Sequence, residues 1–124
     1  MSASIVSRTP NSITVQIQIS LQGPMLSVEE GILDATNQVG NLATGEALER
    51  FDTDGNPIQI AEVKMTSKGR VAKEYQTPYG SITVPRHVYQ TSDGGRTYCP
   101  LDSNARILTS STPRFGKIID TVAS

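Results

Sequence analysis

The stretch Tyr79–Asp102, YGSITVPRHVYQTSDGGRTYCPLD, constrains the fold most because it has the pattern of a β-hairpin. Side chains alternate from Ser81 to Thr91, with Ile82, Val84, Arg86, Val88 and Gln90 on one face and Thr83, Pro85, His87, Tyr89 and Thr91 on the other. Asp93-Gly94-Gly95 supplies a positive-φ turn. Pro85 has no amide proton, so we expect an unpaired edge or a bulge beside it.

Whether this turn contains an even or an odd number of residues decides which side chains of the two strands share a face. A two-residue loop places Tyr89 and Tyr98 on one face, and it places Cys99 on the Arg86 face, opposite His87. A catalytic Cys–His pair is therefore not predicted, and Cys99 is interpreted as a small buried hydrophobe. One cysteine and one histidine are also too few to ligate zinc.

Strands are predicted on both sides of a helix. Ile13–Leu21 alternates apolar and polar residues, which is the period of a strand with one buried face. Ile58–Met65 and Val71–Gln76 are predicted as two strands joined at Ser67–Arg70, and Thr77–Gly80 turns into the hairpin.

A long helix is predicted from about Ser27 to about Phe51, roughly 38 Å at 1.5 Å per residue. Ser27 and Glu30 have capping-box spacing. The apolar stripe that should pack on the sheet comprises Val28, Ile32, Ala35, Val39 and Leu42. Since each helical glycine costs about 1 kcal/mol, a break near Gly45, with Thr44 capping a second helix, is the alternative.

The turn Asp52–Pro57 has Asp, Asp and Asn at positions one, three and five, as in a calcium loop. An EF-hand also needs Gly at position six and Glu at position twelve, where this chain has Pro57 and Val63. The segment is interpreted as a solvated turn.

Near the end of the chain, Thr112 and Pro113 are typical of a helix start. One helical face would carry Phe115, Ile118, Ile119 and Val122. The predicted fold class is α+β, with an N-terminal strand, a long helix, an antiparallel sheet of about four strands around the hairpin, and a C-terminal helix start. Residues 1–110 are predicted to form the domain, and 111–124 to begin a helix that leads into a missing domain.

Charge is unevenly distributed along the 124 residues. Up to Glu62 there are two basic and eight acidic residues, whereas nine basic and four acidic residues follow. The basic half indicates an anionic partner, or the two halves complement each other within one fold. Because Cys99 is the only cysteine and no long apolar run is present, we expect a cytosolic protein without disulfides and without a membrane partner.

Two longer stretches carry a family resemblance. TPYGSITVPRHVYQTSDGGRTYCPLD, followed by ARILTSSTPRFGKII, resembles the N-terminal region of Kra-group insertion-sequence transposases, and LATGEALERFDTDGNPI fits the same region. In that family this region precedes a nuclease domain whose carboxylates bind divalent metal. The resemblance implies a bacterial transposase fragment that lacks this domain, so neither a catalytic residue nor a cofactor is assigned to this chain.

The expected function is that of a DNA-associated accessory domain or truncated fragment, in the bacterial cytoplasm at the nucleoid. The expected partners are DNA at the transposon ends and the remainder of the transposase or a second copy of the chain. Candidate phosphate-binding residues are Lys68, Arg70, Lys73, Arg86, Arg96, Arg114 and Lys117. The alternative is a non-catalytic dimerisation or packing module without DNA contact. An independent small enzyme is disfavoured because no base, nucleophile or metal cluster can be assembled.

Overall fold

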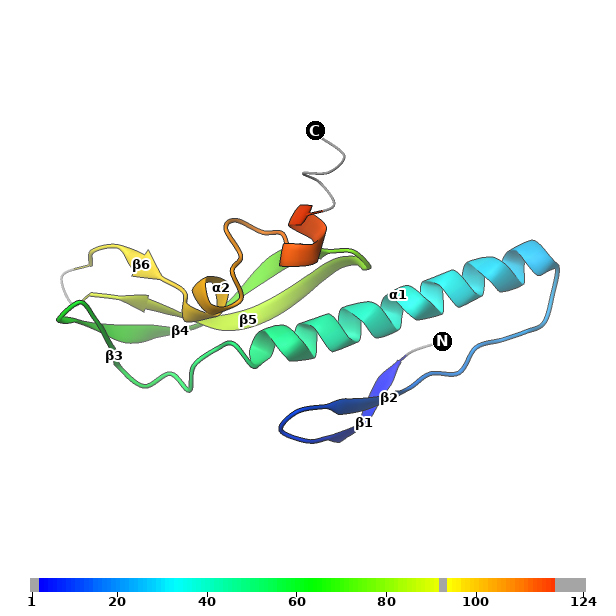
Figure 1. The fold of residues 1–124 in the computed structure, drawn as a ribbon, viewed down its shortest axis with the longest axis horizontal. Coiled ribbons are helices and arrows are strands. Elements are labelled where there is room, and N and C mark those ends of the chain that lie inside the picture. Colours follow the sequence, from blue (N-terminus) through cyan, green and yellow to red (C-terminus); the bar gives the residue numbers. More distant parts are fainter. Residues whose placement is uncertain (1–2, 92–93, 118–124) are drawn as a thin grey trace.

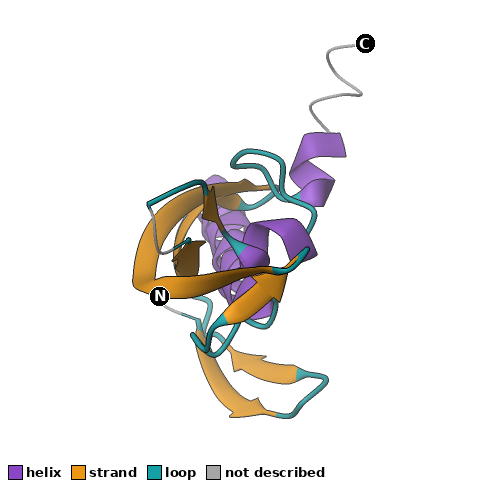
Figure 2. Cartoon of the chain, turned by 90° about the vertical axis from the view of Figure 1, so that its left-hand side faces the viewer, coloured by secondary structure: helices purple, strands orange, loops and turns teal. Residues whose placement is uncertain are grey.

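The computed structural model describes residues 3–91 and 94–117. The elements are, in order, β1 (Ser4–Arg8), β2 (Ile13–Gln16), α1 (Met25–Glu49), β3 (Ile58–Ile60), β4 (Val63–Thr77), β5 (Gly80–Gln90), β6 (Thr97–Tyr98) and α2 (Pro100–Asn104). β1 and β2 form an antiparallel pair, and the other strands form an antiparallel sheet in the order β3-β4-β5-β6. The predicted α+β class is confirmed. α1 lies between the two sheets (Figures 1 and 2).

The N-terminal strand is shorter than predicted. The strand pattern runs from Ile13 to Leu21, but only Ile13–Gln16 is a strand, paired with the unpredicted β1. Residues 17–22 have no regular secondary structure. Ile17 and Ile19 are still half-buried, because they lie against Ala35 and Val39 of α1. The side-chain alternation thus reflects burial on the helix, while no neighbouring strand is present to pair with this segment.

α1 begins earlier than predicted and does not break. It starts at Met25 after Pro24 and has no side-chain cap, so the capping box of Ser27 and Glu30 is wrong. It continues through Gly45 to Glu49, so the two-helix alternative is also wrong. At 25 residues α1 is about 37 Å long. Its N-terminal half extends beyond the end of the four-stranded sheet (Figure 1).

The apolar stripe of α1 contacts two different surfaces. Ala35 and Val39 lie against the irregular segment after β2, and Leu42 lies beside β5. Val28 and Ala35 are buried, whereas Ile32 is 38% exposed. The prediction that the whole stripe packs on the sheet is therefore wrong for the N-terminal half, which the sheet is too short to cover.

β4 and β5 form the principal hairpin, and they are joined by the predicted turn at Thr77–Gly80. β4 runs through the predicted Ser67–Arg70 connection as one strand with an irregularity there. The first predicted strand is instead split by Ala61 and Glu62, both at positive φ, into β3 and the start of β4. This turn closes a short hairpin where a single strand was expected.

The β5–β6 connection has an even number of residues, as predicted. Tyr89 pairs with Tyr98, so both share a face, and Cys99 lies on the face opposite His87, as predicted. The loop contains six residues, so the two-residue turn is wrong, but an even number preserves the faces. In the described structure only Tyr89 and Gln90 of β5 pair with β6, and the rest of β5 pairs with β4 alone. The expected unpaired edge at Pro85 is therefore confirmed.

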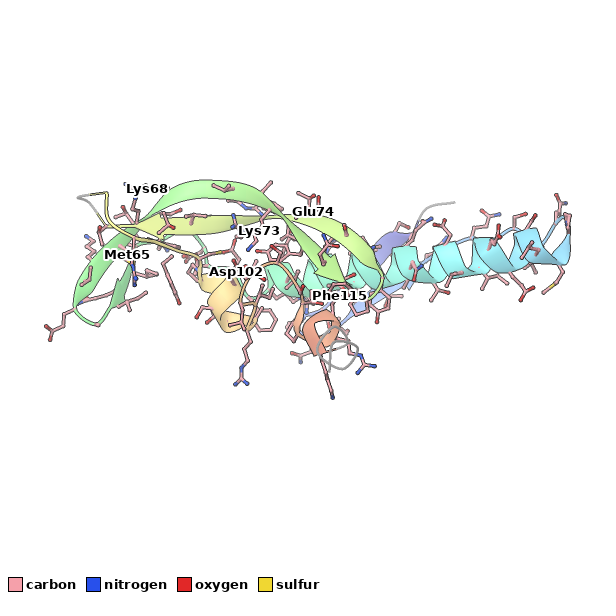
Figure 3. The ribbon with its side chains drawn as sticks, turned by 90° about the horizontal axis from the view of Figure 1, so that it is seen from above. Met65, Lys68, Lys73, Glu74, Asp102 and Phe115 are labelled. Carbon is pink, nitrogen blue, oxygen red and sulfur yellow. The ribbon has the colours of Figure 1, made fainter. Side chains whose placement is uncertain are left out.

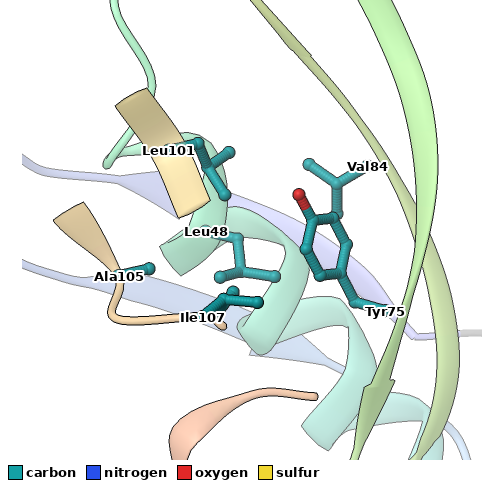
Figure 4. Packing of buried hydrophobic residues seen from close by; sticks show 6 residues of the cluster. All are labelled: Leu48, Tyr75, Val84, Leu101, Ala105 and Ile107. Carbon is teal, nitrogen blue, oxygen red and sulfur yellow. The ribbon is translucent and has the colours of Figure 1, made fainter. Parts of the chain in front are cut away.

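The core lies where α1, the sheet and α2 meet (Figure 4). Its buried residues come from the end of the helix, the middle of the hairpin and the segment after β6: Leu48, Tyr75, Val84, Leu101, Ala105 and Ile107. Tyr75 and Leu101 are fully buried. Burying each large side chain contributes about 1.5–3 kcal/mol, so this cluster holds the end of α1 on the sheet.

The chain after α2 returns to the outer edge of β4. The Gln76 N–H donates to the Ser110 carbonyl (2.7 Å), and the Thr112 N–H donates to the Gln76 carbonyl (2.9 Å). A helix begins at Pro113, as predicted, although the buried Thr112 hydroxyl has no partner among the described residues. The expected apolar positions Ile118, Ile119 and Val122 lie outside the described residues. No described helix is long and apolar enough to cross a membrane.

Candidate nucleic-acid interface

Lys73 and Arg86 point into a polar network beside the core. The Lys73 ammonium lies 3.2 Å from Asp102 Oδ2, donates to the Thr109 carbonyl and sits over the Tyr75 ring. Arg86 donates through Nε to the Tyr75 hydroxyl (3.1 Å) and through Nη1 to the Val71 carbonyl (2.8 Å). These two predicted phosphate ligands have internal partners, and Figure 3 shows Lys73 beside Asp102.

Asp102 organises this network. The Tyr75 hydroxyl donates to Asp102 Oδ1 at 2.5 Å. Burial, with this hydrogen bond and the nearby carboxylate, raises the pKa of Tyr75 far above its ordinary value. Burial also raises the pKa of the half-buried Cys99 thiol, so Cys99 has the character of a core residue and not of a reactive nucleophile.

Lys68 and Arg70 lie at the irregularity of β4. Gly69 between them has φ +102°, its N–H donates to Ser67 Oγ (3.1 Å), and Lys68 is exposed. Arg70 is half-exposed; its Nη2 lies 3.6 Å from Glu49 Oε1 and donates to the Pro85 carbonyl (3.3 Å). An exposed ion pair of this length is worth little, so Arg70 can exchange it for a phosphate.

Arg96 lies at the same end of the sheet. It precedes Thr97, which pairs with Gln90, and Gln90 pairs with Thr66, two residues before Lys68. Neighbouring strands lie about 4.8 Å apart, so the three strands bring these cations within reach of one duplex. We call this surface the basic end; it comprises the exposed residues Lys64, Lys68, Arg70 and Arg96. Lys64 was not among the predicted site residues.

Arg114 and Lys117 belong to the helical turn after Thr112. Both are exposed. This turn follows the segment that pairs with Gln76, near the opposite end of the β4–β5 hairpin from the bulge at Lys68. The seven predicted residues therefore do not form one patch: three lie at the basic end, two are in the Asp102 network and two are in the C-terminal turn.

No pattern in the sequence indicates that Asp52 and His87 contact each other. Asp52 Oδ2 lies 2.9 Å from His87 Nδ1, and the Asp52 carboxylate also accepts the His87 backbone N–H. His87 Nε2 is covered by Gly55, because a Cβ on that glycine would lie 3.0 Å from it. The pair therefore fastens the 50–57 loop to β5, together with the hydrogen bond from Thr53 to Tyr89. No cluster of metal-ligating side chains occurs in the described part of the chain.

Comparisons of the chain with protein-family models, with curated proteins and with solved structures found no match. The resemblance to transposases therefore stays a prediction.

Proposed function

We propose that this chain is a non-catalytic accessory module, of the insertion-sequence transposase type, that contacts duplex DNA through the basic end. The observation that carries the proposal is the separation of the cations into two classes. Lys64, Lys68 and Arg96 are exposed and form no ion pair with another described residue, whereas Lys73 and Arg86 have internal partners. Cations without carboxylate partners can neutralise phosphates without breaking a folded-state contact.

The chemistry of this surface favours contact with the phosphate backbone. Lysine and arginine side chains on an edge of a sheet fix the position of a duplex but carry no base-specific information by themselves. With four cations the affinity should be weak, only loosely dependent on sequence, and lost quickly as salt is added. Such a module would assist a separate nuclease domain in the bacterial cytoplasm, holding transposon DNA near it.

The proposal is tested by a fluorescence-anisotropy titration of a labelled duplex at several salt concentrations. Each neutralised phosphate contributes about 0.9 to the slope of log affinity against log salt. Replacing Lys68 and Arg96 together by Gln should lower that slope by about two and leave the unfolding midpoint unchanged, since both side chains are exposed.

A charge-matched control is available in the same chain. Arg106 and Arg114 are exposed and lie outside the basic end, so the double change Arg106→Gln and Arg114→Gln removes the same charge elsewhere. The control should keep the wild-type slope. An equal decrease of the salt slope in the two double variants would mean that binding depends on total charge and not on the basic end. No binding of the wild type at low salt would refute the DNA contact.

A further inference from the structure

The outer edge of β5 is open for strand pairing at Ser81 and Thr83, while the Pro85 carbonyl farther along accepts from Arg70 Nη2. Gln76 uses its N–H and C=O on the far side of β4, toward Ser110 and Thr112. In an antiparallel ladder its partner Ser81 must then direct its own backbone groups away from β4. The His87 N–H, which donates to Asp52, points the same way. The backbone groups of Ser81 and Thr83 between them have no backbone partner among the described residues.

This open edge borders a groove. The groove has a volume of about 570 Å³ and lies between β5 and the C-terminal half of α1. Leu42, Glu46 and Glu49 of the helix lie on one side, and Ser81–Val84 lies on the other. Gly45 has no side chain to fill the space between them, and Ala3 lies at the groove where β1 begins. A helix beside an unpaired strand edge is the geometry that accepts an added strand.

The chain also contains an extended segment without a strand partner, Ile17–Leu21. Its sequence alternates as a strand does, its backbone makes no backbone hydrogen bond with another described residue, and Gln18 and Ser20 are exposed. A five-residue strand spans about 17 Å, so the segment is long enough to run past Ser81 and Thr83 on the β5 edge. Within the described residues, the chain thus contains both an unpaired stretch of the β5 edge and an unpaired extended segment.

We propose that the groove binds Ile17–Leu21 of a second copy of this chain, which adds a strand to β5. The segment lies beside residues 35–39 of its own α1, and the groove lies beside residues 38–49. Two α1 helices placed antiparallel therefore bring each segment to the other copy's groove. The exchange is reciprocal, so it closes into a twofold dimer and does not propagate.

Charge and exposed apolar surface favour the same occupant. Residues 25–34 of α1 carry Glu29, Glu30 and Asp34 and no base. Near the groove, Arg8 and Arg70 pair with Glu46 and Glu49. Arg50, at the end of α1, donates only to carbonyl groups, so it is a cation that can meet the incoming acidic helix without breaking an ion pair. The large side chains left in water at the end of α1 are Leu21, Met25, Leu26 and Leu33, each more than 60% exposed, which a partner would cover.

The association is tested without DNA, by sedimentation velocity of the full chain over a range of concentrations. The wild type should form a dimer. Thr83→Pro removes an outward N–H and should weaken the dimer about tenfold or more, whereas Thr83→Val keeps the N–H and should not. Far-UV circular dichroism verifies that both variants fold. A monomer at every concentration, or equal effects of the two changes, would overturn the proposal.

A disulfide test identifies the occupant independently of these variants. In a Cys99→Ala background, Gln18→Cys and Thr83→Cys proteins are mixed and oxidised. The proposal requires a mixed disulfide between the two proteins. A dominant Thr83→Cys homodimer would show that two β5 edges pair with each other, and the absence of any covalent dimer would exclude the exchange.

Discussion

At the scale of single residues, Asp102 determines how Lys73, Tyr75 and Arg86 are used. Its carboxylate accepts from the Lys73 ammonium and from the Tyr75 hydroxyl, and that hydroxyl accepts in turn from Arg86. A partly buried carboxylate such as Asp102 needs partners of this kind, because removing one leaves a partly desolvated charge without compensation. These cations therefore stabilise the fold, and a duplex could recruit them only at the cost of the network.

Replacing Tyr75 by Phe tests this network. The variant should lose about 1.5–3 kcal/mol of unfolding free energy at neutral pH, since a hydrogen bond to a charged group disappears. The raised pKa keeps the folded phenol neutral after the unfolded phenol ionises, so the stability that the hydroxyl gives is complete below about pH 10 and declines above it. Urea unfolding at several pH values should therefore show that the difference in unfolding free energy between wild type and variant becomes smaller as the pH rises beyond 10. A difference that becomes larger above pH 10 would contradict the hydrogen bond of the Tyr75 hydroxyl to Asp102.

At the scale of elements, α1 is held by different contacts along its length. Its C-terminal end packs in the core through Leu48. Farther back, Arg50 donates to the carbonyl groups of Thr9, Pro10 and Ser12, so a single side chain attaches the β1–β2 turn to the helix end. In the N-terminal half, Ala35 and Thr36 lie beside the segment after β2, while Met25, Leu26 and Leu33 are each more than 60% exposed.

The glycines of α1 give a matched pair of substitutions. A Cβ at Gly40 would lie 2.3 Å from Cγ of Tyr79, whereas a Cβ at Gly45 meets only Ile82 Cδ1 at 3.9 Å. Gly45→Ala should stabilise the protein by about 0.5–1 kcal/mol through helix propensity. Gly40→Ala should destabilise it, because the Tyr79 ring must move. Thermal unfolding of both variants checks this. An equal rise of the unfolding temperature in both would contradict the close contact of Gly40 with Tyr79.

Local patterns in the sequence located most elements but not their partners. Periods of two and of three to four residues predicted β5 and α1, and parity alone placed Tyr89 beside Tyr98. The strand pattern of residues 17–21 was misleading because an extended segment packed on a helix has the same alternation. The contact of Asp52 with His87 joins residues 35 positions apart, and the partners of Lys73 lie 29 and 36 positions away. Pairings at such separations depend on the tertiary fold, and no local spacing encodes them.

At the scale of the whole molecule, the acidic and basic halves partly neutralise each other. Arg70 of the basic half lies 3.6 Å from Glu49 of the acidic half. Lys64, Lys68 and Arg96, which form no ion pair with another described residue, lie where β4, β5 and β6 end together, whereas Arg106 and Arg114 are exposed elsewhere. Internal complementarity, one of the two alternatives from composition, therefore describes Arg70, while the anionic partner, the other alternative, stays a proposal for the basic end.

The most direct test of the DNA contact is a residue-resolved NMR titration of the labelled chain with a short duplex at low salt. We predict that amide shifts concentrate at residues 64–70 and 94–98, and that Lys73 and Arg86 keep their resonances because their internal contacts persist. The shifts should disappear as salt is raised. Shifts concentrated at the α1–β5 groove or at residues 113–117, or no shifts at any duplex concentration, would contradict the proposed interface.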